Sequence, residues 1–327
     1  MISKPLVSVI MSVYKEPEAY LRASIESILN QTFKDFEFLI AIDDPQNNEV
    51  VKVVKEYAKG DDRIKYFINE ENLGLPASLN LLISKSKGEY LARMDGDDIS
   101  LEHRLEKQIE YMEKNNDIGI LGTLAYKMDK SGVIYGVLNI PTNEKHIDIY
   151  LTNGITPLIH PSIIVRRKVY EKLGGYRCEF FHAEDYDFYC RARKIGIRIQ
   201  NLNQVLLKYR VHSHKYKISY NSYLQYKLTK FIAKGCKSQI SDDEYHAFFK
   251  KLNSNGYLDE IFAKLYIFSR THFIKATDFK SKNKTIKFLI HFLLSCISPH
   301  HLDIIFRAIK TKFSCRLDSF INNIKIR

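Results

Sequence analysis

The sequence has few cysteines, and their arrangement excludes the common cysteine-based sites. No two of them form a Cys-x-x-Cys pair, and no cysteines and histidines have the spacing of a zinc site. An odd, scattered set of this kind indicates reduced thiols and a cytoplasmic protein. The five residues are Cys178, Cys190, Cys236, Cys296 and Cys315.

Long hydrophobic runs are also missing. The N-terminal apolar run extends only as far as Tyr14, which is too short and too strand-like for a signal peptide or an anchor. The apolar run at 288–297 has ten residues, whereas a helix that crosses a bilayer needs about 20. No internal repeat or low-complexity segment is present. With 45% hydrophobic and 27% charged residues, the 327-residue chain is expected to be globular.

Acidic residues are scarce in the last third of the chain. Residues 205–327 contain 23 Lys and Arg against 8 Asp and Glu, a net charge of +15. The rest contains 27 basic and 30 acidic residues, a net charge of −3. We therefore expect a catalytic or binding domain over 1–215 and a basic helical extension over 216–327. Basic tails bind nucleic acid, anionic lipid or no specific partner.

The first part of the chain alternates strand and helix patterns. Three βα units in sequence predict a mostly parallel, doubly wound central sheet that is flanked by helices. From Tyr220 onward the pattern predicts helices without further strands. Apolar and β-branched runs predict strands at 6–12, 36–42, 64–68, 90–94, 118–126, 162–166 and 204–211.

Aspartates follow two of the predicted parallel strands. Asp43 ends the second strand, and Asp95, Asp97 and Asp98 follow the fourth in the sequence Arg-Met-Asp-Gly-Asp-Asp. The carboxyl ends of parallel strands lie along one edge of a sheet, where α/β proteins bind ligands. Neighbouring carboxylates repel one another unless a cation or donors compensate, and hard oxygen ligands suit Mg²⁺ or Mn²⁺. The alternative for the second cluster is a solvated turn that caps the following helix.

A second acidic segment, Glu184-Asp185-Tyr186-Asp187, follows a glycine turn at 174–175. Three acids in the first turn of a helix complement its dipole, which is a purely structural interpretation. The functional interpretation is a carboxylate that faces an acceptor hydroxyl and acts as a general base.

Taken together, these residues resemble the family 2 glycosyltransferases, which are inverting enzymes of the GT-A fold. The resemblance covers residues 6–212, about two-thirds of the chain, and leaves the basic tail uncovered. It is carried by segments 7–14, 27–33, 92–98 with its Asp-x-Asp triplet, 104–108, 174–176 and 184–185.

The resemblance implies a GT-A fold with a nucleotide-sugar donor site at the sheet edge. Ser12 and Asp43 would contact the base and ribose of a donor that we expect to be UDP-linked. Asp95 would lie near the ribose, and Tyr14 and Arg93, from the same two motifs, would complete the donor contacts.

The resemblance also implies a metal ligand and a base. Asp97 would hold Mn²⁺ or Mg²⁺ against the donor diphosphate, with His212 as a further ligand, and Arg210 would meet phosphate. Asp185 would be the general base, oriented by Glu184. A single displacement would then pass the sugar to a hydroxyl of a glycan or lipid-linked acceptor, as in the synthesis of a capsule or O-antigen.

Two other functions remain as alternatives. A nucleotidyltransferase also combines an α/β sheet with acidic metal ligands, but it usually has a glycine-rich phosphate loop where this chain has Tyr14-Lys15-Glu16-Pro17. A nucleic-acid-binding protein would use the basic tail. No recognised binding motif is present and the motif-bearing part is net acidic, so we expect no nucleic acid as partner.

The basic tail itself has two interpretations. Helices with apolar faces and basic borders are typical of proteins that lie on anionic lipid, which predicts peripheral contact with the inner face of the plasma membrane. The alternative is a helical subdomain that packs on the catalytic domain and leaves its lysines solvated. The basic residues that border the apolar run are Lys280, Lys282, Lys284, Lys287, Arg307, Lys310, Lys312 and Arg316.

Overall fold

The structure, a computed structural model, describes residues 4–211, 219–254, 257–282 and 284–325. It forms two compact units. The first contains residues up to 147 together with 156–211, and the second contains 148–155 together with the chain after Val211.

The first unit is built on a nine-stranded sheet, whose first four strands are β1 (Val7–Val13), β2 (Phe36–Ile42), β3 (Ile64–Ile68) and β4 (Tyr90–Asp95). β1 pairs in parallel with β2 and with β4, and β2 pairs in parallel with β3. Every residue of β2 is buried, as expected for a parallel strand that helices cover on both faces. Because β1, β2 and β4 are buried on both faces, their sequences are largely apolar rather than alternating.

The other half of the sheet is mixed. It contains β5 (Ile99–Ser100), β6 (Ile118–Met128), β7 (Ile134–Leu138), β8 (Ile164–Arg166) and β9 (Arg198–Arg210). β8 is antiparallel to both β4 and β6 and so joins the two halves, while β6 and β9 are parallel. The strand order is β3-β2-β1-β4-β8-β6-β9-β5, with β7 paired to β6 outside this path.

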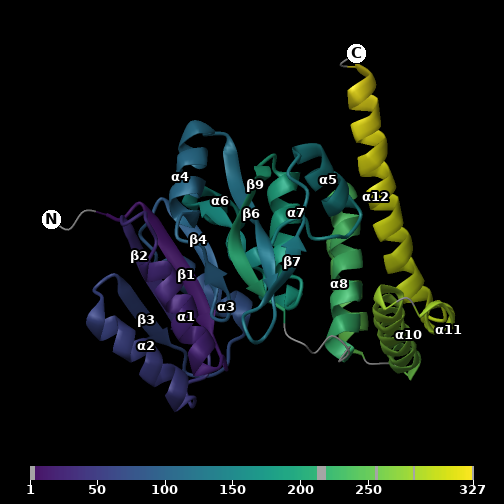
Figure 1. The fold of residues 1–327 in the computed structure, drawn as a ribbon, viewed down its shortest axis with the longest axis horizontal. Helices are drawn as coiled ribbons and strands as arrows, with labels where there is room; N and C mark the ends of the chain where they lie inside the picture. The colour runs from purple at the N-terminus through teal and green to yellow at the C-terminus, as the bar shows by residue number, and fades with distance from the viewer. Residues whose placement is uncertain (1–3, 212–218, 255–256, 283, 326–327) are drawn as a thin grey trace. The chain divides into compact units, whose positions relative to one another are not determined.

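Helices connect and cover these strands (Figure 1). The apolar faces of the first, second and fourth helices share one core with the sheet, including Leu21, Val53 and Leu105. The third contacts β1 and β2, the sixth contacts β8, and the seventh contacts β9. The bounds are α1 (Glu18–Leu29), α2 (Asn48–Gly60), α3 (Leu75–Lys85), α4 (Arg104–Lys114), α5 (Glu144–Thr152), α6 (Arg167–Leu173) and α7 (Glu184–Lys194).

The expected fold class, a mostly parallel sheet flanked by helices and followed by a helical region, is confirmed. The sequence patterns missed β5, β7 and α6, and they placed the start of β9 six residues too late. β5 has only two residues, which is too few to show a periodicity. No residue of β7 is fully buried, so packing gave its sequence little alternation. The seven-residue helix α6 ends at Gly174, whose φ of +70° suits glycine.

Gln31, just after α1, forms hydrogen bonds with the segment at 100–105, which follows the aspartates at 95–98. Its Nε2 donates to the carbonyl of Ser27 at 2.9 Å, to Ser100 Oγ at 3.1 Å and to the carbonyl of Leu101 at 2.8 Å. Its Oε1 accepts the N–H of Leu105 at 3.0 Å. This buried side chain thereby joins α1, β5 and the first turn of α4.

Replacing Gln31 with leucine should lower the free energy of unfolding by about 2 to 4 kcal/mol, because several buried polar groups would lose their partner. Urea denaturation is the measurement. Gln46→Leu, at an exposed position of the same unit, is the matched control and should change stability little. Equal effects of the two substitutions would contradict the bracing role of Gln31.

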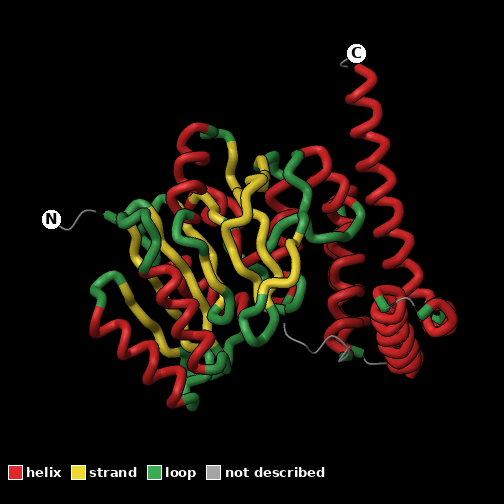
Figure 2. Tube along the Cα trace, in the orientation of Figure 1, coloured by secondary structure: helices red, strands yellow, loops and turns green. Residues whose placement is uncertain are grey.

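The second unit contains helices and, among its described residues, no strand (Figure 2). A core of aromatic side chains includes Tyr223, Tyr226 and Tyr266, which are nearly inaccessible to solvent. The helices are α8 (Tyr220–Lys237), α9 (Asp242–Asn253), α10 (Tyr257–Ser281), α11 (Thr285–Ser295) and α12 (Pro299–Lys325).

Candidate active site

The carboxyl edge of the parallel strands brings three predicted site residues together. Ser12 is the register partner of Asp95 across β1 and β4, and it pairs with Ala41 of β2 on its other side. Asp43, directly after β2, is held by a hydrogen bond from its N–H to the carbonyl of Val13 at 2.7 Å. The edge therefore places Ser12, Asp43 and Asp95 side by side.

The turn between β4 and β5 concentrates three carboxylates. Ligand oxygens of Asp95, Asp97 and Asp98 all lie within 4.8 Å of one another. Asp98 is buried, and its Oδ1 accepts the N–H of Arg210 at 2.7 Å. Its Oδ2 has no hydrogen-bond partner among the described residues. Burial, followed by the charges of Asp95 and Asp97, raises the pKa of Asp98 well above its usual range.

This donor set fits a hard divalent cation. Carboxylate oxygens are the ligands that Mn²⁺ and Mg²⁺ prefer, and a buried carboxylate oxygen without a partner is otherwise costly. The alternative of a helix-capping turn is wrong for this cluster. His103 occupies the cap position of α4, and no side chain caps that helix.

Glu16 is a further acid at this edge, which the sequence analysis did not select. Its Oε2 accepts the N–H of Tyr14 at 2.7 Å, and a Cβ added at Gly96 would lie 3.1 Å from Glu16 Cγ. Burial raises the pKa of Glu16 to about 7, and the charges of Asp97 and Asp95 add to this rise. The available signal was its position in the loop after β1, which ends beside β4.

Arg93 is the central cation of the site. It is 2% exposed, and its guanidinium forms an ion pair with Asp95. Its Nε and Nη1 have no hydrogen-bond partner among the residues that the structure describes. Burial raises the pKa values of both Glu184 and Asp185, and the positive charge of Arg93 opposes that rise. A buried arginine whose N–H groups are not all hydrogen-bonded within the protein is suited to bind an anionic ligand.

Glu184 and Asp185 begin α7. Glu184 is buried, and its Oε2 has no partner within the described ranges. Burial and the charge of Asp185 raise the pKa of Glu184 to about 7. Desolvation raises the pKa of Asp185, opposed by the N–H of Tyr186, which donates to Asp185 Oδ1 at 2.7 Å. The charge of Asp95 contributes to the same rise.

Asp187 has a structural role, unlike its two acidic neighbours. It is fully buried and forms ion pairs with Arg177 and with Arg191, whose Nε lies 2.8 Å from Asp187 Oδ2. The pair with Arg177 anchors α7 to the segment before it, and the pair with Arg191 lies within α7. The dipole interpretation of this acidic segment accounts at most for part of it, since Glu184 and Asp187 lie in buried surroundings rather than in solvent.

The segment before α7 is strained and closely packed. His182 has a φ of +77°, and no other described residue except glycine has a positive φ. Such conformations cost about 1 to 3 kcal/mol and cluster at functional sites. The preceding Phe181 packs against Gly74, where an added Cβ would lie 3.6 Å from its ring. The loop at 69–74 and the start of α7 therefore touch.

Another group that the sequence analysis missed lies close to Arg93. His160 Nε2 is 3.0 Å from the Tyr176 hydroxyl, which is 3.1 Å from that of Tyr170. Burial and the charge of Arg93 hold the pKa of His160 well below its usual range, so its imidazole is neutral. A lone histidine after a predicted loop gave no signal that it would pack here.

Of two predicted donor-binding residues, Asp43 already has protein partners for its side chain and Tyr14 is exposed. Asp43 Oδ1 accepts from Asn69 Nδ2 at 2.7 Å and from the N–H of Leu73 at 2.9 Å, and its Oδ2 accepts from the N–H of Gly74. Asp43 therefore shapes the loop at 69–74. Tyr14 is exposed, so its ring is accessible to a ligand.

Arg210 is occupied in a way that the sequence did not indicate. Its Nε donates to the carbonyl of Asp97 at 2.8 Å and its Nη1 to that of Asp129 at 3.1 Å, while its guanidinium lies 3.9 Å from the centre of the Tyr20 ring. These contacts hold the acidic turn against the end of β9. The predicted contact of Arg210 with phosphate stays a prediction. His212, the expected further metal ligand, lies outside the described residues.

The sheet and its carboxylate edge place the protein among the α/β enzymes that bind ligands where parallel strands end. The family model "Glycosyl transferase family 2" matches residues 8–174. The chain therefore belongs to glycosyl transferase family 2, and it is an enzyme that transfers glycosyl groups.

Three relatives agree with this assignment. The chain is 42% identical over 213 residues to an uncharacterized glycosyltransferase of Methanocaldococcus jannaschii, covering 64% of this chain and 72% of the relative. It is 35% identical over 250 residues to the O-antigen biosynthesis glycosyltransferase WbnJ of Escherichia coli, covering 74% and 94%. It is 28% identical over 207 residues to an Escherichia coli UDP-Gal:alpha-D-GlcNAc-diphosphoundecaprenol beta-1,3-galactosyltransferase, covering 63% and 74%.

Two solved structures share the fold. TarS 1-349 of S. aureus in complex with UDP-GlcNAc superposes with a TM-score of 0.56 at 15% identity, covering 88% of this chain and 90% of that one. The mannosyltransferase PcManGT of Pyrobaculum calidifontis, in complex with GDP-Man and Mn²⁺, gives 0.57 at 11% identity, covering 96% and 88%. The GT-A-like architecture expected from the sequence is thereby confirmed.

Proposed function

We propose that the enzyme is an inverting, cation-assisted glycosyltransferase with a UDP-linked sugar donor and Asp185 as general base. One observation carries the proposal. At the acidic cluster after β4, Arg93 forms an ion pair with Asp95. At the acid pair that begins α7, the charges of both Arg93 and Asp95 act on the pKa of Asp185. A donor held at the first group would therefore present its sugar to an acceptor hydroxyl at the second.

The residues of this chain divide the work. Ser12 and Asp95 contact the ribose of the sugar nucleotide. The Nε and Nη1 groups of Arg93 donate hydrogen bonds to a negatively charged part of the same molecule. Asp185 accepts the proton of the attacking hydroxyl, which raises the nucleophilicity of that oxygen. Attack on the face opposite the leaving diphosphate inverts the anomeric carbon. Glu184 lies beside Asp185 and orients it, and the charge of Asp185 raises the pKa of Glu184, so Asp185 is the first of the two to ionise.

Asp97, Asp95 and Asp98 would hold the divalent cation. When bound, Mn²⁺ or Mg²⁺ supplies charge stabilisation for the departing nucleoside diphosphate. The complexes of the two structural neighbours with UDP-GlcNAc and with GDP-Man and Mn²⁺ support this class of donor and cation. Membership of the glycosyltransferase family disfavours the nucleotidyltransferase alternative.

A thermal-shift comparison of nucleotide sugars tests the donor. UDP-sugars with Mn²⁺ should raise the melting temperature, because a ligand that binds the folded state stabilises it. UDP-sugars with excess chelator should raise it far less. A GDP-sugar that stabilises the protein more than every UDP-sugar would overturn the UDP assignment.

We further propose a lipid-linked acceptor and peripheral contact with a membrane. An Escherichia coli relative is named for transfer to a diphosphoundecaprenol-linked sugar. Among the described residues no single helix is long and apolar enough to cross a bilayer; α11 with part of α12 would pass only as a pair that is bent by 112°. Apolar side chains on these two helices and between them are nonetheless about half exposed or more: Ile286, Leu289, Ile290, Leu293, Ile297, Phe306, Ile309 and Phe313.

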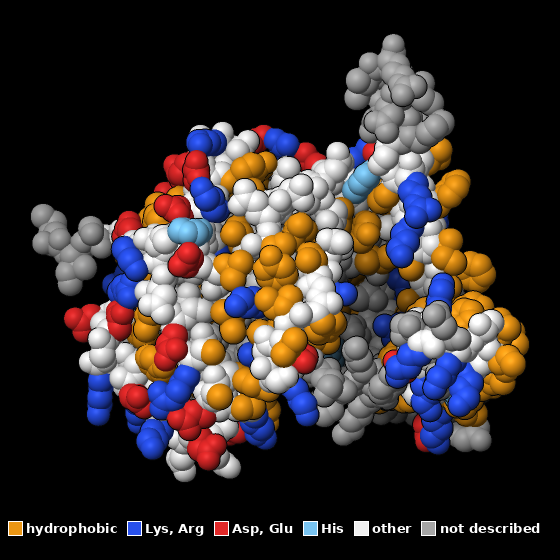
Figure 3. Space-filling model, in the orientation of Figure 1, with side chains coloured by type: hydrophobic (Ala, Val, Ile, Leu, Met, Phe, Trp, Pro, Cys, Tyr) orange, Lys and Arg blue, Asp and Glu red, His pale blue; other side chains and the backbone are white. Residues whose placement is uncertain are grey.

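Hydrophobic side chains of the C-terminal helices lie beside lysines and arginines in Figure 3. This combination is suited to anionic lipid, and it favours the membrane over a purely solvated tail. Cosedimentation with phosphatidylglycerol vesicles, and not with phosphatidylcholine vesicles, is the expected result. Equal recovery from both kinds of vesicle, or from neither, would contradict the proposed contact.

The rate of transfer should fall at low pH. Asp185 must be ionised to accept a proton, and its pKa is raised above its ordinary value of 3.8. Below the folded-state pKa, kcat/KM should fall about tenfold for each pH unit. Glu184→Gln should leave this fall in place, because Asp185 ionises before Glu184, whose pKa is raised to about 7 by burial and by the charge of Asp185. The exposed Glu171→Gln is the control, and a profile that stays flat to about pH 4 would contradict the assignment.

A further inference from the structure

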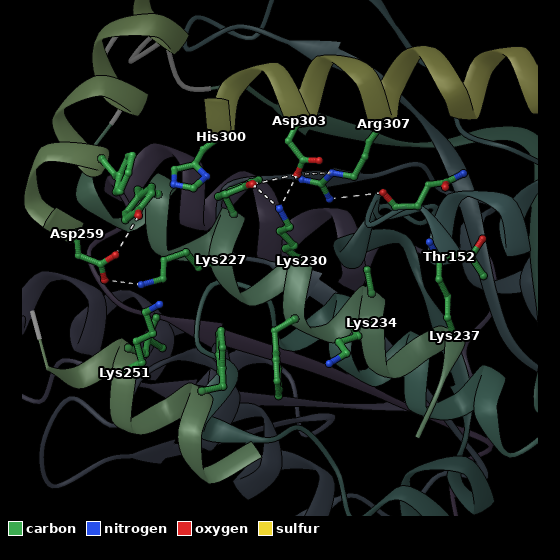
Figure 4. Close-up of a pocket in the computed structure, with 18 of the residues that line it drawn as sticks. Thr152, Lys227, Lys230, Lys234, Lys237, Lys251, Asp259, His300, Asp303 and Arg307 are labelled. Carbon is green, nitrogen blue, oxygen red and sulfur yellow. Dashed lines mark hydrogen bonds and ion pairs between the residues drawn. The ribbon is translucent and has the colours of Figure 1, made fainter. Parts of the chain in front are cut away.

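The second unit contains a cavity that the proposed catalysis does not use. Its volume is about 790 Å³, within the range of small-molecule sites. α8, α9, α10 and α12 form its walls, together with Thr152 and Asn153 at the end of α5 (Figure 4). All of these residues belong to one compact unit.

The cavity is strongly basic. Seven lysines and arginines line it against two aspartates. Both aspartates are already paired: Asp259 lies 2.6 Å from Lys227 Nζ, and Asp303 lies 3.5 Å from Lys230 Nζ. The basic residues are Lys227, Lys230, Lys234, Lys237, Lys251, Arg307 and Lys310.

Three of these lysines have no ion-pair partner of their own among the described residues, and the one that acts electrostatically on Asp259, Lys251, shares that aspartate with Lys227. No ion pair or side-chain hydrogen bond of Lys237, Lys251 or Lys310 exists within the described part of the chain. Lys234 pairs with Glu244, which lies outside the lining. A cavity with this excess of positive charge is suited to a phosphate or diphosphate group, which carries two or more charges of the opposite sign.

The remaining wall is aromatic. Phe231 and Phe248 stack with their ring centres 3.9 Å apart, and Phe262 packs edge-on against His300 at 5.1 Å. Burying such rings against a hydrocarbon chain stabilises binding by about 25 cal/mol per Å². Basic and aromatic surfaces therefore occur in the same cavity.

The wall offers little to a nucleobase. The tyrosine hydroxyls are already donated, that of Tyr226 to Asp303 at 2.9 Å and that of Tyr223 to Asp259 at 3.3 Å. Thr152 Oγ1 donates to the carbonyl of Asp148 at 2.9 Å. Since the neutral polar groups are largely satisfied within the protein, an apolar chain fits the wall better than a base that needs hydrogen bonds.

We propose that this cavity binds the phosphate or diphosphate head of an amphiphile, whose hydrocarbon chain lies on the aromatic wall. The assignment of the ligand class rests on the cavity alone, whereas its identification with the lipid of the acceptor rests on the proposed function. Lys237, Lys251 and Lys310 hold the anionic head, and Phe231, Phe248 and Phe262 contact the chain.

The experiment uses the full chain and farnesyl diphosphate as a soluble amphiphilic probe, measured by isothermal titration calorimetry. Farnesyl diphosphate should bind at least about tenfold more tightly than inorganic diphosphate or farnesol, and raising the salt concentration should weaken it. Inorganic diphosphate binding as tightly as the amphiphile would reduce the site to a free phosphate site. Farnesol binding equally well, or farnesyl diphosphate not binding, would overturn the proposal.

Two double variants distinguish the loss of lysines that line the cavity from a general loss of positive charge. Lys251→Gln with Lys310→Gln should weaken farnesyl diphosphate about tenfold. The control, Lys250→Gln with Lys312→Gln, removes equal charge from exposed neighbours on the same two helices that do not line the cavity, and it should change affinity less than twofold. Equal losses in both variants would overturn the assigned lysines.

The same variants distinguish this inference from the proposed catalysis. Stabilisation by UDP-sugar and Mn²⁺ should be equal in the wild type and in both double variants. Probe binding without any donor binding would overturn the proposed function and leave the cavity assignment standing. Donor binding with no probe binding would do the opposite.

Discussion

Asp97→Ala is expected to lower cation-dependent turnover of the donor by about 10³-fold. The carboxylate lies in the cluster whose oxygens fall within 4.8 Å of one another, and its loss removes one of the three candidate ligands. Charge stabilisation by a bound cation contributes several kcal/mol to such reactions, and about 1.4 kcal/mol corresponds to a tenfold change in rate. Turnover of the sugar nucleotide across a Mn²⁺ titration is the measurement.

Loss of cation binding should also appear without catalysis. Mn²⁺ with UDP-sugar should no longer raise the melting temperature of the Asp97→Ala variant. The matched control is Asp62→Ala, which removes an exposed aspartate from the same unit and should leave both properties unchanged. Wild-type dependence of the Asp97 variant on Mn²⁺ would refute the assigned ligand.

Asp185→Asn should remove transfer and leave donor binding within about twofold of the wild type. An amide cannot accept the proton of the acceptor hydroxyl, and general bases contribute about 10² to 10⁴-fold to rates. Asparagine keeps the size of the side chain and its hydrogen bond from the N–H of Tyr186. Transfer of labelled sugar to acceptor and thermal shift with donor give the two quantities.

The neighbouring Asp187→Asn separates chemistry from folding. Asp187 pairs with Arg177 and Arg191 in the interior, so its loss should cost stability. The transfer rate per folded molecule should nevertheless stay within about threefold of the wild type. Unchanged transfer by Asp185→Asn, or a loss confined to Asp187→Asn, would refute Asp185 as the base.

The centre of the sheet could be predicted from sequence because β1, β2 and β4 are buried on both faces. Continuous apolar runs such as 36–42 have few alternative structures, and β2 and β3 begin and end where the pattern predicts. The expected division into a domain over 1–215 and an extension over 216–327 stays a prediction. The shape of the basic cavity could not be predicted, since it depends on how four helices pack.

The edge of the sheet was predictable in part for the same reason. A βα unit fixes which residue ends each parallel strand, so Ser12 and Asp95 could be expected to meet. Periodicity could not select Glu16 or His160, because both lie outside the regular strands and α-helices, although the position of Glu16 just after β1 offered a signal. The partners of Arg210 were equally hidden, since they are backbone carbonyls, which every residue has. The assigned roles of the site residues remain predictions.

The imbalance of charge around Arg93 has a consequence for the sequence of events in a catalytic cycle. Four acids, Asp95, Asp97, Asp98 and Glu16, gather at this edge. Arg93 is already paired with Asp95, and the guanidinium of Arg210 is bonded to the carbonyl of Asp97. An approaching diphosphate would meet a repulsive field until a divalent cation has entered. We therefore expect loading to be ordered, with the cation arriving before or together with the donor and the acceptor last. Departure of the nucleoside diphosphate would then free the cation as well, and turnover would slow when free Mn²⁺ or Mg²⁺ is scarce.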